Sequence, residues 1–136
     1  LLPRRAGDPA PPASLRLPGS ANWMGWRIEA EEIPRVAARI PSGGPNVEYA
    51  DLAAATGPLE VRGARPGDRF HPLGAPGHTA LAEFLRARGV DARERPFWPI
   101  VACDREVIWV VGKRISERAR IRADSRRIHR LRASRT

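Results

Sequence analysis

The sequence predicts an α+β fold, a small layered domain of mixed or antiparallel strands with one or two short helices. Two observations favour this class. Short apolar segments recur along the chain between clusters of proline and glycine, as they do in β-rich domains. Residues 80–88 have their large apolar residues at clear helical spacing. With 136 residues the chain is long enough for one domain with its own core, but not for two.

The first forty residues divide at about residue 20. Residues 1–20 contain five prolines and few large apolar side chains, so we expect a linker or a disordered lead-in. Residues 23–30 are largely apolar and predict a strand. Apolar residues then recur at helical spacing around Pro34, a residue suited to the first turn of a helix, which predicts a short helix over residues 33–40.

Two strands and a tight turn follow. Residues 47–52 and 59–62 predict strands because they are apolar and are bounded by turn residues. In the next sequence, RPGD, Pro66 presets φ at the second position and Gly67 accepts a positive φ at the third, which predicts a type II turn. Asp68 is expected to accept hydrogen bonds from the turn amides or to pair with an arginine.

A helix and a hairpin are predicted next. The helix spans residues 80–88, with Thr79 available as its N-cap and Gly89 as the residue that ends it in the left-handed conformation. The apolar segments 98–103 and 107–111 flank three turn-forming residues and predict a β-hairpin.

After the hairpin, arginines recur at every second position, which predicts a strand over residues 113–122. One face of that strand would carry Arg114, Ser116, Arg118, Arg120 and Arg122. Guanidinium groups in such a row repel one another unless carboxylates or an external polyanion lie opposite. A solvated edge with local glutamate partners remains the alternative, but acidic residues are scarce here and nucleic-acid contact is favoured.

The remaining residues, from Ser125, form either a last strand or a basic extension. The predicted organisation is therefore a lead-in over 1–20, one α+β domain over 21–124 and a basic tail over 125–136. Because the chain begins with Leu rather than Met, we expect it to be part of a longer protein.

Positive charge is concentrated near the C-terminus. The formal net charge is +9, and residues 105–136 hold ten arginines and one lysine against three acidic residues, a net charge of +8. Such an excess indicates a polyanionic partner, most often nucleic acid, with an anionic membrane surface or simple solvation as alternatives. No apolar run is long enough to cross a bilayer and no signal-peptide pattern opens the chain, so we expect a cytoplasmic protein without a membrane partner.

Catalytic and metal-binding patterns are absent from the sequence. One cysteine and three scattered histidines do not have the spacing of a zinc site, and no nucleotide-binding or hydrolytic motif occurs. Ser42, Gly43 and Gly44 resemble the start of the phosphate loop of PP-loop enzymes, but Asn46 and Val47 stand where the Asp and second Ser of that loop would be. We therefore expect no catalytic residue, no metal and no cofactor in this chain.

Two sequence blocks resemble a known family. The segment Leu59 to Ile121 is similar to the C-terminal domain of bacterial tRNA(Ile)-lysidine synthetase over about half of the chain. The blocks that carry the resemblance are RPGDRFHPLG, from Arg65 to Gly74, and WVVGKRISER, from Trp109 to Arg118.

The resemblance implies a part of an enzyme rather than a whole one. In this family an N-terminal PP-loop domain uses ATP and magnesium to adenylate the wobble cytidine of tRNA(Ile), and lysine then displaces AMP to form lysidine. The C-terminal domains hold the tRNA, the last one at its acceptor stem. Its implied fold is shared with the phenylalanyl-tRNA synthetase β subunit, and the implied partners are tRNA(Ile) and the catalytic domain of the parent.

The predicted tRNA contacts are seven arginines, with Pro66, Gly67 and Asp68 as a structural turn. They are Arg62, Arg65, Arg69, Arg95, Arg114, Arg118 and Arg120. Thr79 and Ala80 replace two lysines usual in the family, which removes two candidate phosphate contacts. The competing hypothesis is a structural docking module without direct RNA contact, in which Arg62, Arg65 and Asp68 form an internal ion-pair network.

Overall fold

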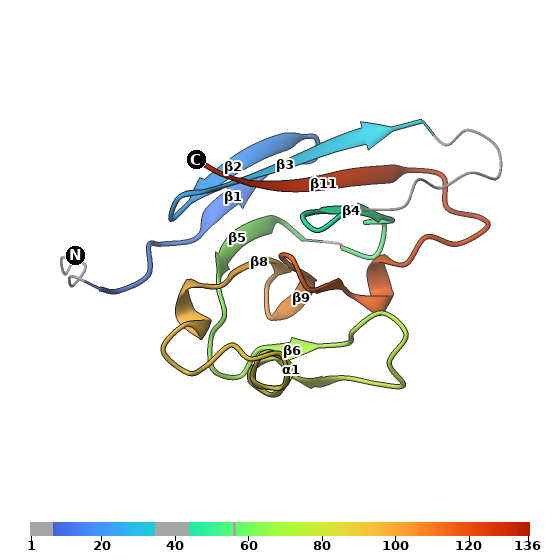
Figure 1. The fold of residues 1–136 in the computed structure, drawn as a ribbon. Helices are drawn as coiled ribbons and strands as arrows, with labels where there is room; N and C mark the ends of the chain where they lie inside the picture. The colour runs from blue at the N-terminus through green and yellow to red at the C-terminus, as the bar shows by residue number, and fades with distance from the viewer. Residues whose placement is uncertain (1–6, 35–43, 56) are drawn as a thin grey trace.

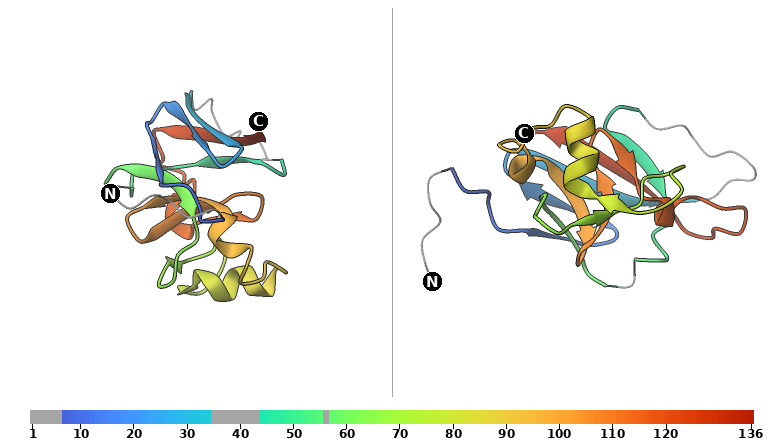
Figure 2. Two further views of the ribbon diagram at one scale, coloured as in Figure 1. Left: turned by 90° about the vertical axis from the view of Figure 1, so that its left-hand side faces the viewer. Right: turned by 90° about the horizontal axis from the view of Figure 1, so that it is seen from below.

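Three layers make up the molecule in the computed structural model, which describes residues 7–34, 44–55 and 57–136. A four-stranded sheet lies on one side, a seven-stranded sheet lies in the middle, and helix α1 (Leu81–Ala87) packs below it (Figures 1 and 2). Pairing is antiparallel except for one parallel contact, between β6 and β9. The predicted α+β class is confirmed.

The two sheets draw their strands from distant parts of the chain. The four-stranded sheet has the order β2 (Gly19–Trp23), β3 (Trp26–Ile33), β11 (Ile128–Arg135), β4 (Val47–Ala50). The seven-stranded sheet has the order β1 (Ala13–Leu15), β5 (Leu59–Gly63), β8 (Pro99–Cys103), β9 (Glu106–Val110), β6 (Arg69–Phe70), β7 (Thr79–Ala80), with β10 (Arg114–Ile115) added to β9. Two short 3₁₀ helices, η1 (Arg95–Phe97) and η2 (Glu117–Ala119), complete the elements.

Each space between layers holds one apolar cluster. Between the sheets, Trp23 and Leu131 of the four-stranded sheet pack with Trp109 of the middle, seven-stranded sheet in one cluster. On the other face of the middle sheet, Phe84 of α1 packs edge to face on Phe70 in the second cluster, with their ring centroids 4.9 Å apart. The middle sheet is therefore buried on both faces, which explains its nearly continuous apolar strands.

The ends of the described chain belong to the sheets. Residues 13–15 pair with β5 and residues 19–20 start β2, so the predicted lead-in is wrong for these positions. The prolines of this part of the chain precede the short strands β1 and β2 in the sequence and do not fall within them. Of the two alternatives for the tail, the last strand is correct: β11 lies between β3 and β4, and buries Leu131 and Ala133.

The predicted helix is confirmed, with one correction at its start. Its N-cap is Ala80, whose methyl group cannot accept a cap hydrogen bond, and not Thr79, which is held in β7 opposite Phe70. At the other end Gly89 has φ +80°, and the amide of Val90 donates to Leu85 O at 3.0 Å. This is a Schellman ending, as the glycine predicts.

The hairpin is confirmed, and a β-bulge in β9 determines which of its side chains face the space between the sheets. Val101 pairs with Trp109 and Ala102 with Val107, so Ile108 is the extra residue of a β-bulge. The bulge lets Ile108 and Trp109 both join the cluster between the sheets.

The predicted strand of alternating arginines is wrong. Only Arg114 and Ile115 pair as a strand, and the chain turns into η2 directly afterwards. Ser116 causes the change, because it is fully buried and its hydroxyl accepts the Arg118 amide at 3.1 Å as the cap of the 3₁₀ turn. The arginines therefore do not form one row. The helix expected over residues 33–40 falls mostly outside the described residues, although Ile33 itself is in β3.

No helix in the described part of the chain is long and apolar enough to cross a membrane.

Candidate nucleic-acid interface

Arg62 and Asp68 form a buried ion pair beneath the RPGD turn. Both side chains are 2% exposed, and the guanidinium binds the carboxylate through two hydrogen bonds of 2.8 and 2.9 Å. Its remaining N–H groups donate to Glu60, Gly63 O and Asp104 O. Every donor of the guanidinium is therefore occupied within the protein.

This geometry corrects one predicted RNA contact. Arg62 cannot meet a phosphate without losing buried partners, so its assignment as an RNA contact is wrong and the internal network of the competing hypothesis is right for Arg62 and Asp68. Arg65 takes part only through its backbone, whose amide donates to the Asp68 carboxylate at 2.7 Å, and its side chain is exposed. The predicted turn is confirmed, with the Asp68 amide donating to Arg65 O and Gly67 at φ +87°.

Arg65 and Arg95 lie at the same cavity, next to this turn. The cavity has a volume of about 300 Å³ and lies between the turn, α1 and the segment that leads into β8. Arg95 is half-buried, and its Nε donates to Val90 O at 3.3 Å.

The two family blocks pack directly against each other. The loop after β6 runs beside the segment from Arg114 to Glu117, with hydrogen bonds from Leu73 N to Ile115 O and from Glu117 N to His71 O. Arg114 adds a side-chain bond to Leu73 O at 3.2 Å. The Gly74 amide donates to Glu117 at 2.9 Å, and this bond holds the pKa of the Glu117 carboxyl below its usual value. Arg114 and Glu117 thus fasten the loop.

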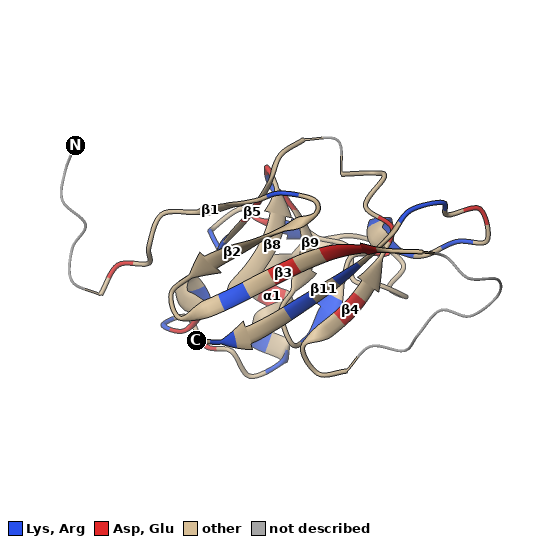
Figure 3. Ribbon diagram, turned by 90° about the horizontal axis from the view of Figure 1, so that it is seen from above, with Lys and Arg blue, Asp and Glu red and all other residues tan. Residues whose placement is uncertain are grey.

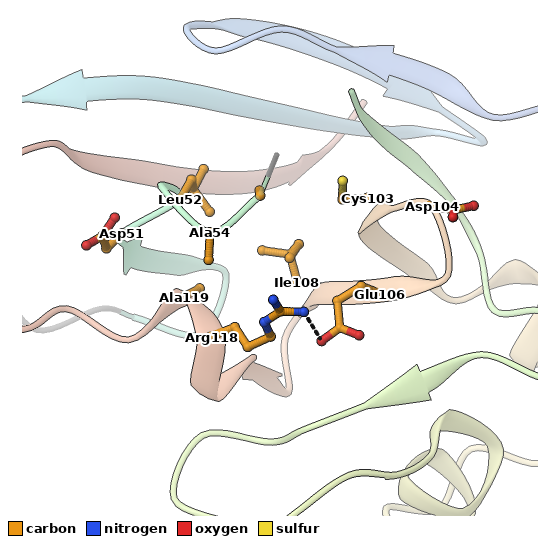
Figure 4. Close-up of a pocket in the computed structure, with 10 residues that line it drawn as sticks. Asp51, Leu52, Ala54, Cys103, Asp104, Glu106, Ile108, Arg118 and Ala119 are labelled. Carbon is orange, nitrogen blue, oxygen red and sulfur yellow. Dashed lines mark ion pairs between the residues drawn. The ribbon is translucent and has the colours of Figure 1, made fainter. Parts of the chain in front are cut away.

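Arg118 and Arg120 are exposed and have carboxylate partners at the surface. Arg118 lies 3.6 Å from Glu106 (Figure 4). Glu106 also lies 3.4 Å from His78. Arg120 lies 3.4 Å from Glu117. Because exposed ion pairs of this kind contribute only ~0–1 kcal/mol, a phosphate can replace either carboxylate with little loss of stability.

The hairpin turn connects the arginines of the two blocks. Arg105 in that turn extends over the RPGD turn, because a Cβ placed on Gly67 would lie 3.0 Å from its guanidinium. The next residue, Glu106, is opposite Arg69 in the parallel bridge between β6 and β9 and also forms an ion pair with Arg118 at 3.6 Å. We call this continuous set the arginine edge: Arg65, Arg69, Arg105, Arg118 and Arg120.

The C-terminal arginines have a different environment. The strand β11 lies beside β3, whose acidic residues are opposite its basic ones in the ladder, and Figure 3 shows the two strands side by side. Arg130 pairs with Glu31, and Arg127 lies 3.8 Å from Glu32. Much of the positive charge near the C-terminus is therefore balanced within the four-stranded sheet.

Sequence reasoning missed Arg105 and the cavity. The sequence predicts Arg105 as part of the hairpin turn, and nothing in it indicates that this turn lies over residues 65–67. The small residues that leave the cavity open, such as Ala82 and Ala92, carry no signal of their own. Within the described residues, no three His, Cys, Asp or Glu side chains gather as metal ligands would.

Comparisons with known proteins agree with the two blocks. The family described as "TilS substrate C-terminal domain" matches residues 59–132. The tRNA(Ile)-lysidine synthase of Dehalococcoides mccartyi is 32% identical over 107 residues, which are 79% of this chain and 23% of that protein. The enzyme of the same name from Caldanaerobacter subterraneus subsp. tengcongensis is 36% identical over 78 residues, 57% of this chain and 17% of that protein.

A solved structure shows the same fold. The crystal structure of a TilS C-terminal domain superposes with a TM-score of 0.76 at 26% identity, covering 92% of this chain and 96% of that one. The chain spans less than a quarter of the length of these curated relatives. With its two blocks packed together as one unit and matched over more than half of its residues, this chain belongs to the TilS C-terminal domain family.

Proposed function

We propose that this domain binds tRNA(Ile) at its acceptor stem, as the C-terminal domain of a tRNA(Ile)-lysidine synthase. The observation that carries the proposal is the arginine edge. It joins the two family blocks, its side chains are exposed, and its ion pairs are weak enough to yield to phosphates. A-form RNA is recognised through phosphates, 2′-hydroxyls and shape, and guanidinium groups suit all three.

In this proposal the chemistry belongs to the rest of the parent enzyme. Its N-terminal PP-loop domain, with ATP and magnesium, would attach lysine to the wobble cytidine in the cytoplasm. The present domain holds the distant end of the same tRNA and supplies no reacting group. The relatives are named tRNA(Ile)-lysidine synthases and this chain matches only 17% and 23% of their length, which supports a catalytic part outside this domain.

Binding of a tRNA(Ile) transcript at several salt concentrations tests the proposal. If the domain contacts Z phosphates, the logarithm of its affinity falls with the logarithm of salt with a slope of about 0.7Z to 0.9Z. Arg118→Ala is expected to reduce that slope by about one, whereas Arg127→Ala, at an exposed arginine paired with Glu32 outside the arginine edge, leaves it unchanged.

Affinity that is weak and insensitive to salt, in a protein that melts normally, would instead support the docking module. That alternative rests on the buried pair of Arg62 and Asp68, which indicates that Asp68 of the block RPGDRF serves the fold.

A further inference from the structure

The cavity between Arg65 and Arg95 has an apolar lining and a basic rim. Its volume is about 300 Å³, and α1, beside it, faces the viewer in the right-hand view of Figure 2. The two arginines are its only charged lining residues in the described part of the chain. The apolar lining consists of small side chains: Ala64, Pro66, Ala82, Ala92 and Pro96.

The walls of the cavity are fixed by the backbone. The Ala64 amide donates to Arg95 O at 3.2 Å, which ties the turn to η1. Gly63 lies against the carbonyl of Pro96, so closely that a Cβ there would overlap the oxygen. The cavity is therefore preformed, and a ligand entering it does not have to order these walls.

The two guanidinium groups are available to an anion. Arg95 uses its Nε on Val90 O, which orients the group and leaves its terminal N–H groups without a hydrogen bond among the described residues. Its charge also acts on the exposed carboxylate of Glu83, which is bound by Arg86 at 2.6 Å and has its pKa lowered mainly by Arg86 and less by Arg95. The side chain of Arg65 has no hydrogen bond or ion pair among the described residues, and the nearby carboxylate of Asp68 is already bound by Arg62. Asp68 therefore does not compete for Arg65.

We infer that this cavity receives one unpaired nucleotide of the bound RNA, with its base on the alanine and proline surface and its phosphate between Arg65 and Arg95. The inference rests on the proposed function and deepens it. A phosphate alone would use the rim but not the apolar wall, and a paired base keeps its faces in the duplex stack. An unstacked nucleotide presents both a flat apolar surface and an anion, which is how proteins read single-stranded RNA.

Two RNA hairpins separate the inference from the proposed function. They share one duplex, and one of them also carries a single-stranded 3′ extension. The protein is expected to bind the extended hairpin about tenfold more tightly, equivalent to about 1.4 kcal/mol. Ala82→Leu fills the cavity and is expected to remove this gain while leaving the affinity for the blunt hairpin unchanged. Ala87→Leu, an exposed position of α1 that does not line the cavity, is the matched control.

A direct readout comes from the alanine methyl groups. In protein with labelled alanines, a base in the cavity would shift the NMR signals of Ala64, Ala82 and Ala92 through its ring current, and the signal of Ala87 would not move. Inorganic phosphate, as a separate probe, would leave all four methyl signals in place.

The outcomes are distinct. Equal affinity for the two hairpins, or methyl signals that stay in place, would overturn the nucleotide cavity and leave the proposed function standing. Equal weakening of both hairpins by Ala82→Leu, with unchanged melting, would also overturn it. Failure to bind either hairpin or the tRNA transcript would count against the proposed function itself.

Discussion

At the scale of single residues, the buried pair of Arg62 and Asp68 dominates the region around the turn. Asp68→Ala would leave a fully buried guanidinium without its counter-charge. We expect the free energy of unfolding to fall by about 3–5 kcal/mol, measured by urea denaturation. Arg65→Ala, three residues away and exposed, should change it by less than about 0.5 kcal/mol. A large loss in Arg65→Ala would restore Arg65 to the internal network.

His129 makes stability depend on pH. It is buried among Glu32, Asp51 and Arg127, and burial lowers the pKa of its imidazole below the usual 6.5. A neutral imidazole is thus favoured in the folded state. The contribution of His129 to the free energy of unfolding is therefore complete above pH 6.5, and it is lost as the pH falls below that value towards the lowered pKa.

The measurement is the free energy of unfolding between pH 7.5 and about 5, where we expect a decline. His129→Gln should make the decline shallower, whatever it does to stability at pH 7.5. An identical pH slope in the two proteins would show that His129 does not titrate in this range. Glu48, whose pKa is raised by burial, acts in the opposite direction at lower pH and is common to both proteins.

At the scale of elements, Gly63 sets the distance between β5 and η1. It is buried, and a Cβ placed on it would overlap Pro96 O and lie 3.2 Å from the ring of Trp23. Gly63→Ala should cost about 1–3 kcal/mol through overpacking, as measured by the shift of the denaturation midpoint. Gly77→Ala is the control, because a Cβ there meets nothing within 4 Å. Equal stability of the two variants would mean that η1 can move away freely.

The same scale shows which elements the sequence could predict. The helix and the hairpin carried local signals, namely helical spacing with Gly89 and two apolar runs around a turn, and both were confirmed. The arginine alternation after Gly112 was misleading because a period of two in charge does not require a strand. The conformation of this segment is instead determined by the burial of Ser116 and by the packing of residues 71–74 beside it. Both depend on contacts between distant parts of the chain.

At the scale of the whole molecule, the net positive charge differs from the charge that is exposed to a binding partner, because some arginines are paired with carboxylates inside the protein. The sequence located most of the net charge beyond residue 104, and we interpreted it as a binding surface. In the structure, the basic residues on β11 lie opposite the acidic residues of β3, a strand from the near-neutral N-terminal part of the chain. The candidate site was therefore predictable in part by residue type. Of the seven arginines predicted as RNA contacts, five are exposed, Arg95 is half-buried and Arg62 is buried; the exposed ones are Arg65, Arg69, Arg114, Arg118 and Arg120. No local signal in the sequence indicates the burial of Arg62 against Asp68. Exposure of these residues is established here; their contact with RNA stays a prediction.

The shared cluster between the sheets should make unfolding a single event. Leu131 is fully buried there, and Leu131→Ala is expected to cost about 2–5 kcal/mol. Amide hydrogen exchange should accelerate in both sheets by the same factor, including at Val101 in the middle sheet. Faster exchange confined to the four-stranded sheet would show that the sheets open separately.

The central place of β11 also has a consequence for the order of assembly. Arg130 and its partner Glu31 are 99 positions apart in the chain, so β3 obtains its inner neighbour only after the intervening residues have been synthesised. Contacts that close such long loops slow folding. Until β11 arrives, the edge of the β2–β3 hairpin is open to pairing with another chain. The glutamates along β3, which later meet the arginines of β11, repel a second copy of the same edge during that interval.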